Sequence, residues 1–106
     1  MADTLSMGRG TTPTYVVTFK GIDIDDLLDI YFTFEQSKSN QELTKHFPEV
    51  ESGQGYASVK LSQAETLAFA KGNGKVQIRF IGNDGNAFKT SIVTMEVSDV
   101  LYEEVI

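Results

Sequence analysis

Short stretches in which apolar and polar residues alternate recur along the whole chain. The clearest covers residues 28–36, where apolar side chains share one face and mostly polar residues between them share the other. A period of two is typical of a β-strand with one buried face, because successive side chains point to opposite sides of a sheet. The same alternation, weaker in some cases, predicts strands in further stretches, which are residues 14–20, 42–47, 56–62, 75–81 and 89–97.

Three of the predicted strands have an apolar face that we expect to point into a common core. The residues assigned to inward faces are Leu28, Ile30, Phe32, Phe34, Ala57, Val59, Leu61, Val76, Ile78 and Phe80. Two further sets each share one face of their strand, which are Tyr15, Val17 and Phe19, and Val93, Met95 and Val97, and Tyr15 is expected to be exposed. Residues 42–47 alternate only weakly, through Leu43 and Phe47, with Lys45 interrupting. A lysine in such a strand is typical of the edge of a sheet, where it discourages pairing with another chain. We therefore predict an edge strand here.

The segment that follows the predicted strand at residues 56–62 has the pattern of a short helix. Ser62 and Glu65 have the spacing of a capping box, in which each side chain satisfies a backbone N–H that the first helical turn leaves free. Gly72 is expected to end the helix, since glycine is common just after a helix C-terminus. We predict a helical crossing of about two turns near residues 63–70.

Together these elements predict an all-β fold. Short strands separated by turn signals favour an antiparallel sandwich or barrel, and alternation argues against a parallel sheet buried on both faces. A helical crossing suits the passage between the two sheets of an immunoglobulin-like fold. We predict a single domain over residues 13–106, an antiparallel immunoglobulin-like β-sandwich of about six to seven strands. A polar, flexible N-terminal arm over residues 1–12 is expected to precede it.

The sequence NDGN at residues 83–86 lies between two predicted strands and has two interpretations. Asp-Gly is a strong signal for a tight hairpin turn, because glycine accepts the positive φ that such turns need. A calcium loop would need a ligand series ending in a glutamate, and Phe88, Lys89 and Thr90 stand where carboxylates should be. The hairpin is the favoured interpretation.

Composition narrows the classes of partner. The chain has 106 residues, of which 41% are hydrophobic, enough for one domain with its own core. The formal net charge of −6 argues against nucleic acid and anionic membranes as partners, since both attract basic surfaces. The absence of cysteine excludes disulfides and Cys-ligated zinc. No apolar run approaches the roughly 20 residues that span a bilayer, so we expect no membrane partner.

No pattern of a catalytic or cofactor site emerges from the residues. The acidic group Asp23, Asp25, Asp26 and Asp29 could surround a hard cation. Turn-forming roles, or an acidic patch that faces a partner, are the favoured alternatives. His46 is the only histidine, has no nucleophile motif near it, and is expected to be a surface imidazole. The glycine-rich stretches lack the spacing of phosphate loops. We predict no enzymatic activity, metal or cofactor.

The tyrosines raise a second functional hypothesis. Tyr15, Tyr31, Tyr56 and Tyr102 could form an aromatic platform for carbohydrate, but they lie on separate predicted segments, and ordinary packing is the default. A carbohydrate- or cell-wall-binding module therefore remains an alternative. A third hypothesis is an inhibitor of a host protein that uses the acidic surface.

An ordered set of short motifs resembles small proteins encoded by phages and prophages of Gram-positive bacteria. The motifs are RGTTPTYVVTF, VKLSQAETLAF, KVQIRFIGNDGNAF and VLYEEVI, in that order along residues 9–106. The chain is more distantly similar to the N-terminal immunoglobulin-like domain of siphophage baseplate upper proteins. Those proteins continue into long helical and receptor-linked regions that this chain lacks, so the chain is expected to be a standalone relative.

The resemblance implies a structural or adaptor protein of the phage tail or baseplate, located in the virion and assembled in the host cytoplasm. It brings no catalytic or cofactor residues with it. The implied partners are other phage structural proteins or further copies of the chain, and in the second case the chain would form a homo-oligomer. The expected contact elements are the N-terminal arm, the edge strand and the C-terminal end. Their candidate contact residues are Arg9, Glu42, Thr44, His46, Leu101, Tyr102 and Ile106.

Overall fold

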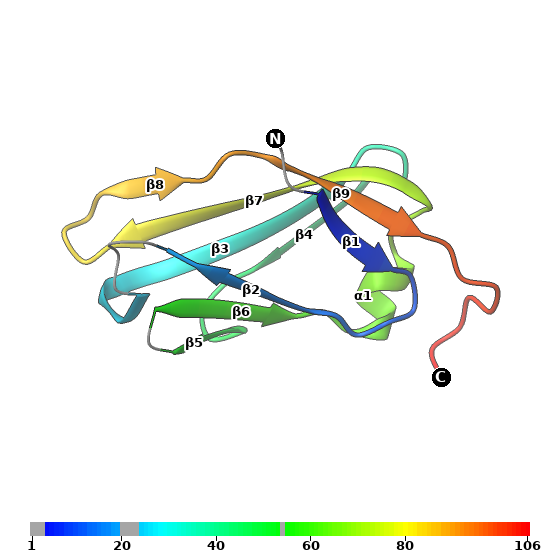
Figure 1. The fold of residues 1–106 in the computed structure, drawn as a ribbon, viewed down its shortest axis with the longest axis horizontal. Helices are drawn as coiled ribbons and strands as arrows, with labels where there is room; N and C mark the ends of the chain where they lie inside the picture. Colours follow the sequence, from blue (N-terminus) through cyan, green and yellow to red (C-terminus); the bar gives the residue numbers. More distant parts are fainter. Residues whose placement is uncertain (1–3, 20–23, 54) are drawn as a thin grey trace.

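The computed structural model describes residues 4–19, 24–53 and 55–106. Its elements, in chain order, are β1 (Thr4–Gly8), β2 (Thr14–Thr18), a 3₁₀ turn η1 (Ile24–Asp26), β3 (Leu27–Gln36), β4 (Gln41–Lys45), β5 (Val50–Gly53), β6 (Tyr56–Lys60), α1 (Gln63–Leu67), β7 (Gly72–Gly82), β8 (Ala87–Lys89) and β9 (Val93–Ser98). The body measures 46 × 29 × 22 Å along its principal axes. The β7–β8 hairpin and the C-terminus lie at opposite ends of the long axis (Figure 1).

The strands form two sheets that face each other (Figure 1). The larger sheet has the order β1-β9-β7-β3-β4, with β8 paired to β7, and the smaller has the order β2-β6-β5. The pairs are antiparallel except for β1 and β9, which run parallel. This arrangement confirms the predicted sandwich, and β4 lies at the edge of its sheet as expected. No helix among the described residues is long and apolar enough to cross a membrane.

The core lies between the two sheets. Its buried apolar residues are Met7, Ile24, Ile30, Phe32, Phe34, Val50, Ala57, Val59, Leu61, Phe69, Val76, Phe80, Met95 and Val97. Tyr15, Val17, Phe19 and Ile78 are partly buried and pack against this cluster. The buried residues include most of those assigned to inward faces, so the predicted faces are largely confirmed. Burial of one large apolar side chain contributes about 1.5–3 kcal/mol to stability.

The N-terminal segment differs from its prediction. Residues 4–8, expected to belong to a flexible arm, form strand β1, and Met7 is only 1% exposed. Leu5 and Met7 supply the apolar side chains that pack on this side of the sandwich. Their alternation is too short to stand out in a polar stretch, and the partner strand β9 is remote in sequence. Residues 1–3 lie outside the described part of the chain.

The start of β3 also departs from the predicted alternation. Leu28 was assigned to the inward face, but it is 60% exposed, and Leu27 is partly buried instead. The cause is a shift in the register between β3 and β7, which falls between Leu27 and Asp29. Such an irregularity moves every residue before it to the other face of the sheet.

The helical crossing is confirmed but shorter than predicted. Ser62 and Glu65 form both hydrogen bonds of the capping box. The helix ends at Leu67 with Ala68 in a right-handed conformation, so Gly72 does not end it. Gly72 instead begins β7, with a φ of +135° that favours glycine.

The predicted hairpin is confirmed at Asp84 and Gly85. Gly85 has a φ of +86°, and Gly82 N donates to Asn86 O at 2.9 Å. The single strand predicted over residues 89–97 is split into β8 and β9. Thr90 lies at the break, where its N–H donates to Ile78 O and its hydroxyl accepts from Ile78 N. Strand β5, which pairs with β6, was not predicted.

Candidate functional site

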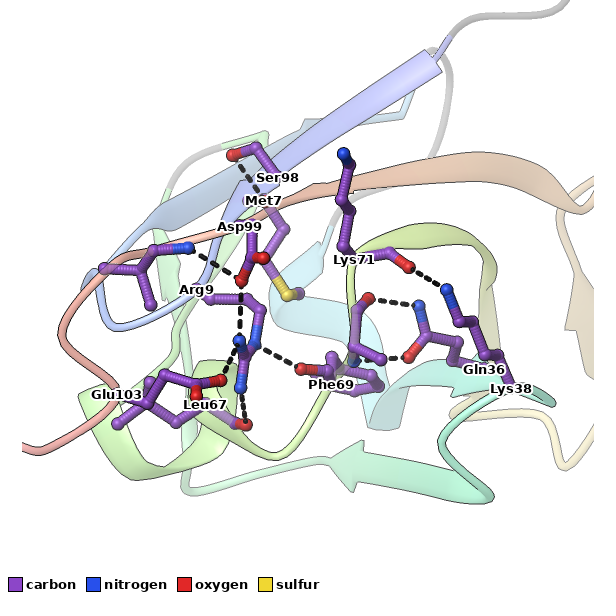
Figure 2. Close-up of polar contacts among 12 residues, drawn as sticks. Met7, Arg9, Gln36, Lys38, Leu67, Phe69, Lys71, Ser98, Asp99 and Glu103 are labelled. Carbon is purple, nitrogen blue, oxygen red and sulfur yellow. Dashed lines mark hydrogen bonds and ion pairs between the residues drawn. The ribbon is translucent and has the colours of Figure 1, made fainter.

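Arg9 is the centre of a polar cluster at the C-terminal end of the molecule (Figure 2). Its guanidinium donates to the carboxylate of Asp99 at 2.7 Å and to that of Glu103 at 2.6 Å. It also donates to the backbone carbonyls of Phe69 at 2.6 Å and Leu67 at 3.1 Å. The side chain of Arg9 is only 13% exposed. These donors are therefore used within the molecule, and a contact of Arg9 with a partner stays a prediction.

The fold explains why these groups meet. Arg9 follows β1, and the parallel pairing of β1 with β9 brings it beside Asp99. The carbonyls of Leu67 and Phe69 lie at the end of α1, where a helix leaves its last carbonyls without internal partners. A positively charged group at that end is favourable. The cluster thus ties the first strand, the crossing and the C-terminal end together.

The contacts of this cluster shift the pKa values of Arg9 and Asp99. Hydrogen bonds to Glu103 and Asp99 raise the pKa of Arg9, although burial opposes the shift. The hydrogen bond from Arg9 lowers the pKa of Asp99, and the backbone N–H of Val100 lowers it further. Both pKa shifts favour the charged forms, so Arg9 and Asp99 stay ionised near neutral pH.

The C-terminal segment, residues 99–106, is attached to the body at a second point. The side-chain amide of Gln63 donates to the backbone carbonyl of Ile106 at 3.2 Å and accepts from its N–H at 2.8 Å. The segment lies beside α1 (Figure 1). Between and at these two attachments it exposes large apolar side chains, each at least 60% exposed, which are Leu101, Tyr102, Val105 and Ile106.

The other predicted contact residues lie at strand β4. Glu42 and Thr44 are exposed on this edge strand, and Thr44 shares a hydrogen bond with Thr33 of β3. Among the described residues, no hydrogen bond or ion pair joins the β4 residues to the C-terminal segment. The structure therefore divides the predicted contact residues into two groups.

His46, just after β4, has a defined environment. Its Nδ1 lies 3.1 Å from Asp29 Oδ2, and its ring stacks on Tyr31 with centroids 4.9 Å apart. Asp29 also accepts hydrogen bonds from the backbone N–H groups of Ile30 and Phe47. Burial would raise the pKa of Asp29, but these hydrogen bonds outweigh it and lower the pKa. The group holds the chain after β4 against β3.

The remaining acidic candidates form no metal site among the residues that the structure describes. Asp23 and the side chain of Asp25 lie outside the described part of the chain. Within the part that is described, no three His, Cys, Asp or Glu side chains are placed to hold a metal ion. Asp84 accepts from the backbone N–H of Asn86 at 3.0 Å and from its side-chain amide at 2.9 Å. Its carboxylate therefore stabilises the hairpin turn.

Gln36 is a structural residue that the sequence analysis missed. It is 1% exposed, and its side chain donates to Ala70 O at 2.6 Å and accepts from Ala70 N at 2.7 Å (Figure 2). Lys38 donates to the next carbonyl, that of Lys71. These bonds fix the chain between α1 and β7. The inward parity of residues 28–36 includes position 36, so the alternation contained the signal for its burial.

The tyrosines do not form one platform. Tyr15 is partly buried, donates to Ser6 O at 2.8 Å, and has a pKa that burial raises to about 12. Tyr31, Tyr56 and Tyr102 are exposed on β3, β6 and the C-terminal segment. The structure therefore gives no support to a carbohydrate site formed by several tyrosines together.

The comparisons with known proteins bear on the fold. No protein-family model matches the chain, and no curated protein has a matching sequence. Among solved structures, the chain is similar to the extracellular domain of mouse leukocyte-associated immunoglobulin-like receptor 1, described as a strand-swapped dimer. The identity is 12%, the TM-score is 0.50, and the match covers 90% of this chain and 87% of that one. A second structure, of the same receptor's Ig-like domain, has 11% identity and a TM-score of 0.49, with 90% and 88% covered. At such identity the first likeness shows the fold alone, and the chain has an immunoglobulin-like β-sandwich fold.

Proposed function

We propose that the chain is a structural or adaptor protein of a phage or prophage particle, associated with its tail or baseplate, and that it acts through protein–protein contacts. The observation that supports this most is the C-terminal segment, which exposes four large apolar side chains. Exposed apolar patches commonly mark protein contact sites. The order of the motifs in the sequence supports the phage context.

The attachment of the segment makes it better suited to binding. Arg9 holds the side chains of Asp99 and Glu103, and Gln63 holds the backbone of Ile106, so less conformational entropy is lost when a partner covers the apolar side chains. An immobile apolar surface therefore gains more from a partner than a loose one with the same residues. The partner is another structural protein of the particle or a further copy of the chain.

Self-association has a second possible surface in this proposal. Strand β4 lies at a sheet edge, and edge strands can pair with a strand of another chain. The mouse receptor domain with the similar fold is described as a strand-swapped dimer. The mass of the purified protein, measured by light scattering after size-exclusion chromatography, distinguishes monomer from oligomer.

The virion location is tested on purified particles. Mass spectrometry of phage particles released from the host should detect the chain at a constant ratio to the tail proteins. Its absence from particles, with the chain present in the host cytoplasm, would overturn the proposed virion role.

The contact surface is tested separately. The double variant Leu101→Ser, Tyr102→Ser should reduce incorporation into particles by at least about tenfold, because anchor residues dominate the affinity of interfaces. The matched control is Ile92→Ser, since Ile92 is also an exposed apolar residue, at 57%. Equal incorporation of the double variant and the control would exclude the C-terminal segment as the contact surface.

A further inference from the structure

A row of aromatic and cationic side chains crosses the outer face of the larger sheet. Tyr31 of β3 is paired with Arg79 of β7, and Arg79 is paired with Lys89 of β8. Tyr31, Arg79 and Lys89 are all exposed. His46 extends the row beyond Tyr31, on which its ring stacks. Arg79 and Lys89 belong to the two strands of the β7–β8 hairpin, which lies at the opposite end of the molecule from the C-terminus (Figure 1).

The pairing of Arg79 with Lys89 is electrostatically unfavourable. Like charges directly opposite each other on neighbouring strands destabilise a sheet. Within the described residues, neither side chain has a carboxylate within ion-pair distance. This occurs in a chain with 15 acidic and nine basic residues, where a counter-charge would be easy to supply. An anion from outside the chain would offset the repulsion.

A hollow adjoins this cationic pair. It has a volume of about 290 Å³ and is lined by Tyr31, Arg79, Phe80, Ile81 and Ala87. Ala87, at the start of β8, is the smallest of these lining residues. A hollow with a mostly apolar wall and a few polar groups at its border has the character of a small-ligand site.

The aromatic wall of the hollow is held in place. One face of the Tyr31 ring is covered by the imidazole of His46, with 18° between the ring planes. His46 is in turn held by Asp29, whose carboxylate lies 3.1 Å from Nδ1 and accepts from two backbone N–H groups. A ring fixed in this way loses little freedom when a ligand packs against it.

We propose that this hollow binds an acidic sugar unit, such as a uronic acid or a sugar phosphate. The apolar face of the sugar ring packs against Tyr31, and its carboxylate or phosphate lies between Arg79 and Lys89. The planar guanidinium of arginine suits both anions, because it can donate two parallel hydrogen bonds. A shallow hollow on an exposed sheet face also suits a polysaccharide, which lies across a surface. This site goes beyond the protein contacts proposed above and does not depend on them.

The test uses the full chain labelled with ¹⁵N and observed by NMR. The probes are glucuronic acid and glucose 6-phosphate, with glucose as the neutral match and inorganic phosphate as the anion match. We expect one or both acidic sugars to shift the amide signals of residues 79–81 and 87–89, with an affinity at least about tenfold above that of either match. If inorganic phosphate binds as tightly as the acidic sugars, the site holds an adventitious ion only. If glucose binds as tightly as they do, the cations Arg79 and Lys89 do not contribute to binding. Either result, or the absence of binding, overturns the proposal.

Variants locate the binding. Arg79→Gln should weaken binding of the acidic sugar by at least about tenfold, because it removes the charge and the paired donors. The matched control is Lys75→Gln, which removes one charge from the same strand and the same outer face. Tyr31→Leu tests the aromatic wall and should also weaken binding. Equal effects of Arg79→Gln and Lys75→Gln would place the binding elsewhere and overturn the assignment.

A protein ligand is the outcome to be separated from a sugar. An acidic peptide of repeated glutamates presents the same charge without a sugar ring. If it binds as tightly as glucuronic acid and Tyr31→Leu has no effect on either, the row recognises acidic protein surfaces and the sugar proposal is wrong.

Discussion

Arg9 and Arg79 show two different uses of the same side chain. Arg9 is mostly buried and donates to two carboxylates and two carbonyls at the C-terminal end of the molecule. Arg79 is exposed near the hairpin end, opposite another cation, and forms no ion pair among the described residues. The first stabilises the fold, whereas the second is available to a ligand.

The contrast between Arg9 and Arg79 distinguishes charged side chains that stabilise the fold from those that are free to bind a ligand. A charged side chain whose donors are all used by remote parts of the chain acts on stability. A charged side chain that lowers the stability of the folded protein at its position indicates a role in binding rather than in folding. We therefore expect substitutions of Arg9 to lower the free energy of unfolding and substitutions of Arg79 to change it little or to raise it.

The largest effect is expected for Arg9→Ala. The variant removes two ion pairs and leaves the carbonyls of Leu67 and Phe69 without their partner. We expect the free energy of unfolding to fall by about 2–3 kcal/mol, measured by urea denaturation. Arg79→Ala is the control and should change it by less than about 0.5 kcal/mol. Similar losses in the two variants would contradict the distinction.

Arg9→Lys tests whether the charge or the shape of the guanidinium matters. An ammonium keeps the charge but cannot reach two carbonyls and two carboxylates from one planar group. In the same denaturation experiment, we expect the free energy of unfolding to fall by about 1–2 kcal/mol relative to the wild type, which is less than the loss for Arg9→Ala. A lysine variant as stable as the wild type would show that charge alone is sufficient.

Arg79→Glu is expected to act in the opposite direction. It converts the pair with Lys89 from like to opposite charges, which should raise the free energy of unfolding by about 0.2–1 kcal/mol. The double variant Arg79→Glu, Lys89→Glu restores like charges and should lose this gain. If the single variant is less stable than the wild type, Arg79 has a structural role that its exposed position does not show.

The smallest effect concerns pH. Because the hydrogen bond from Arg9 lowers the pKa of Asp99 in the folded protein, this group stabilises the fold above its ordinary pKa. The contribution begins to decline as the pH falls below the ordinary aspartate pKa of about 3.9 and is lost as the pH falls through the lowered pKa of the folded protein. The difference in Tm between the wild type and Arg9→Ala should therefore shrink between pH 7 and pH 3. A difference that stays constant would indicate that Arg9 acts through the backbone carbonyls.

Local features of the fold could be predicted from the sequence, because their signals are close together along the chain. The capping box of Ser62 and Glu65, the turn at Asp84 and Gly85, and the alternation within each strand are of this kind. Leu28 was placed on the wrong face because a single shift in register reverses a local alternation.

Remote contacts could not be predicted in the same way. The partners of Arg9 lie 58 to 94 residues away, so no spacing rule connects them. The pairing of Tyr31 with Arg79 requires β3 to lie beside β7, which alternation does not specify. The pairing of Arg79 with Lys89 is nearer in sequence, but counting outward from a two-residue turn at Asp84 and Gly85 would have paired Arg79 with Thr90. The observed register is centred on Asp84 alone, with Gly82 bonded to Asn86.

The parallel pairing of β1 with β9 has a consequence for biosynthesis. Arg9 and Asp99 are separated by 90 residues, so the first strand must wait for almost the whole chain before its neighbour exists. At a translation rate of about 5–20 residues per second, the delay is roughly 5–20 s. Until then the edge of β1, with Leu5 and Met7, is open to other chains, and a nascent-chain chaperone would find its binding site there.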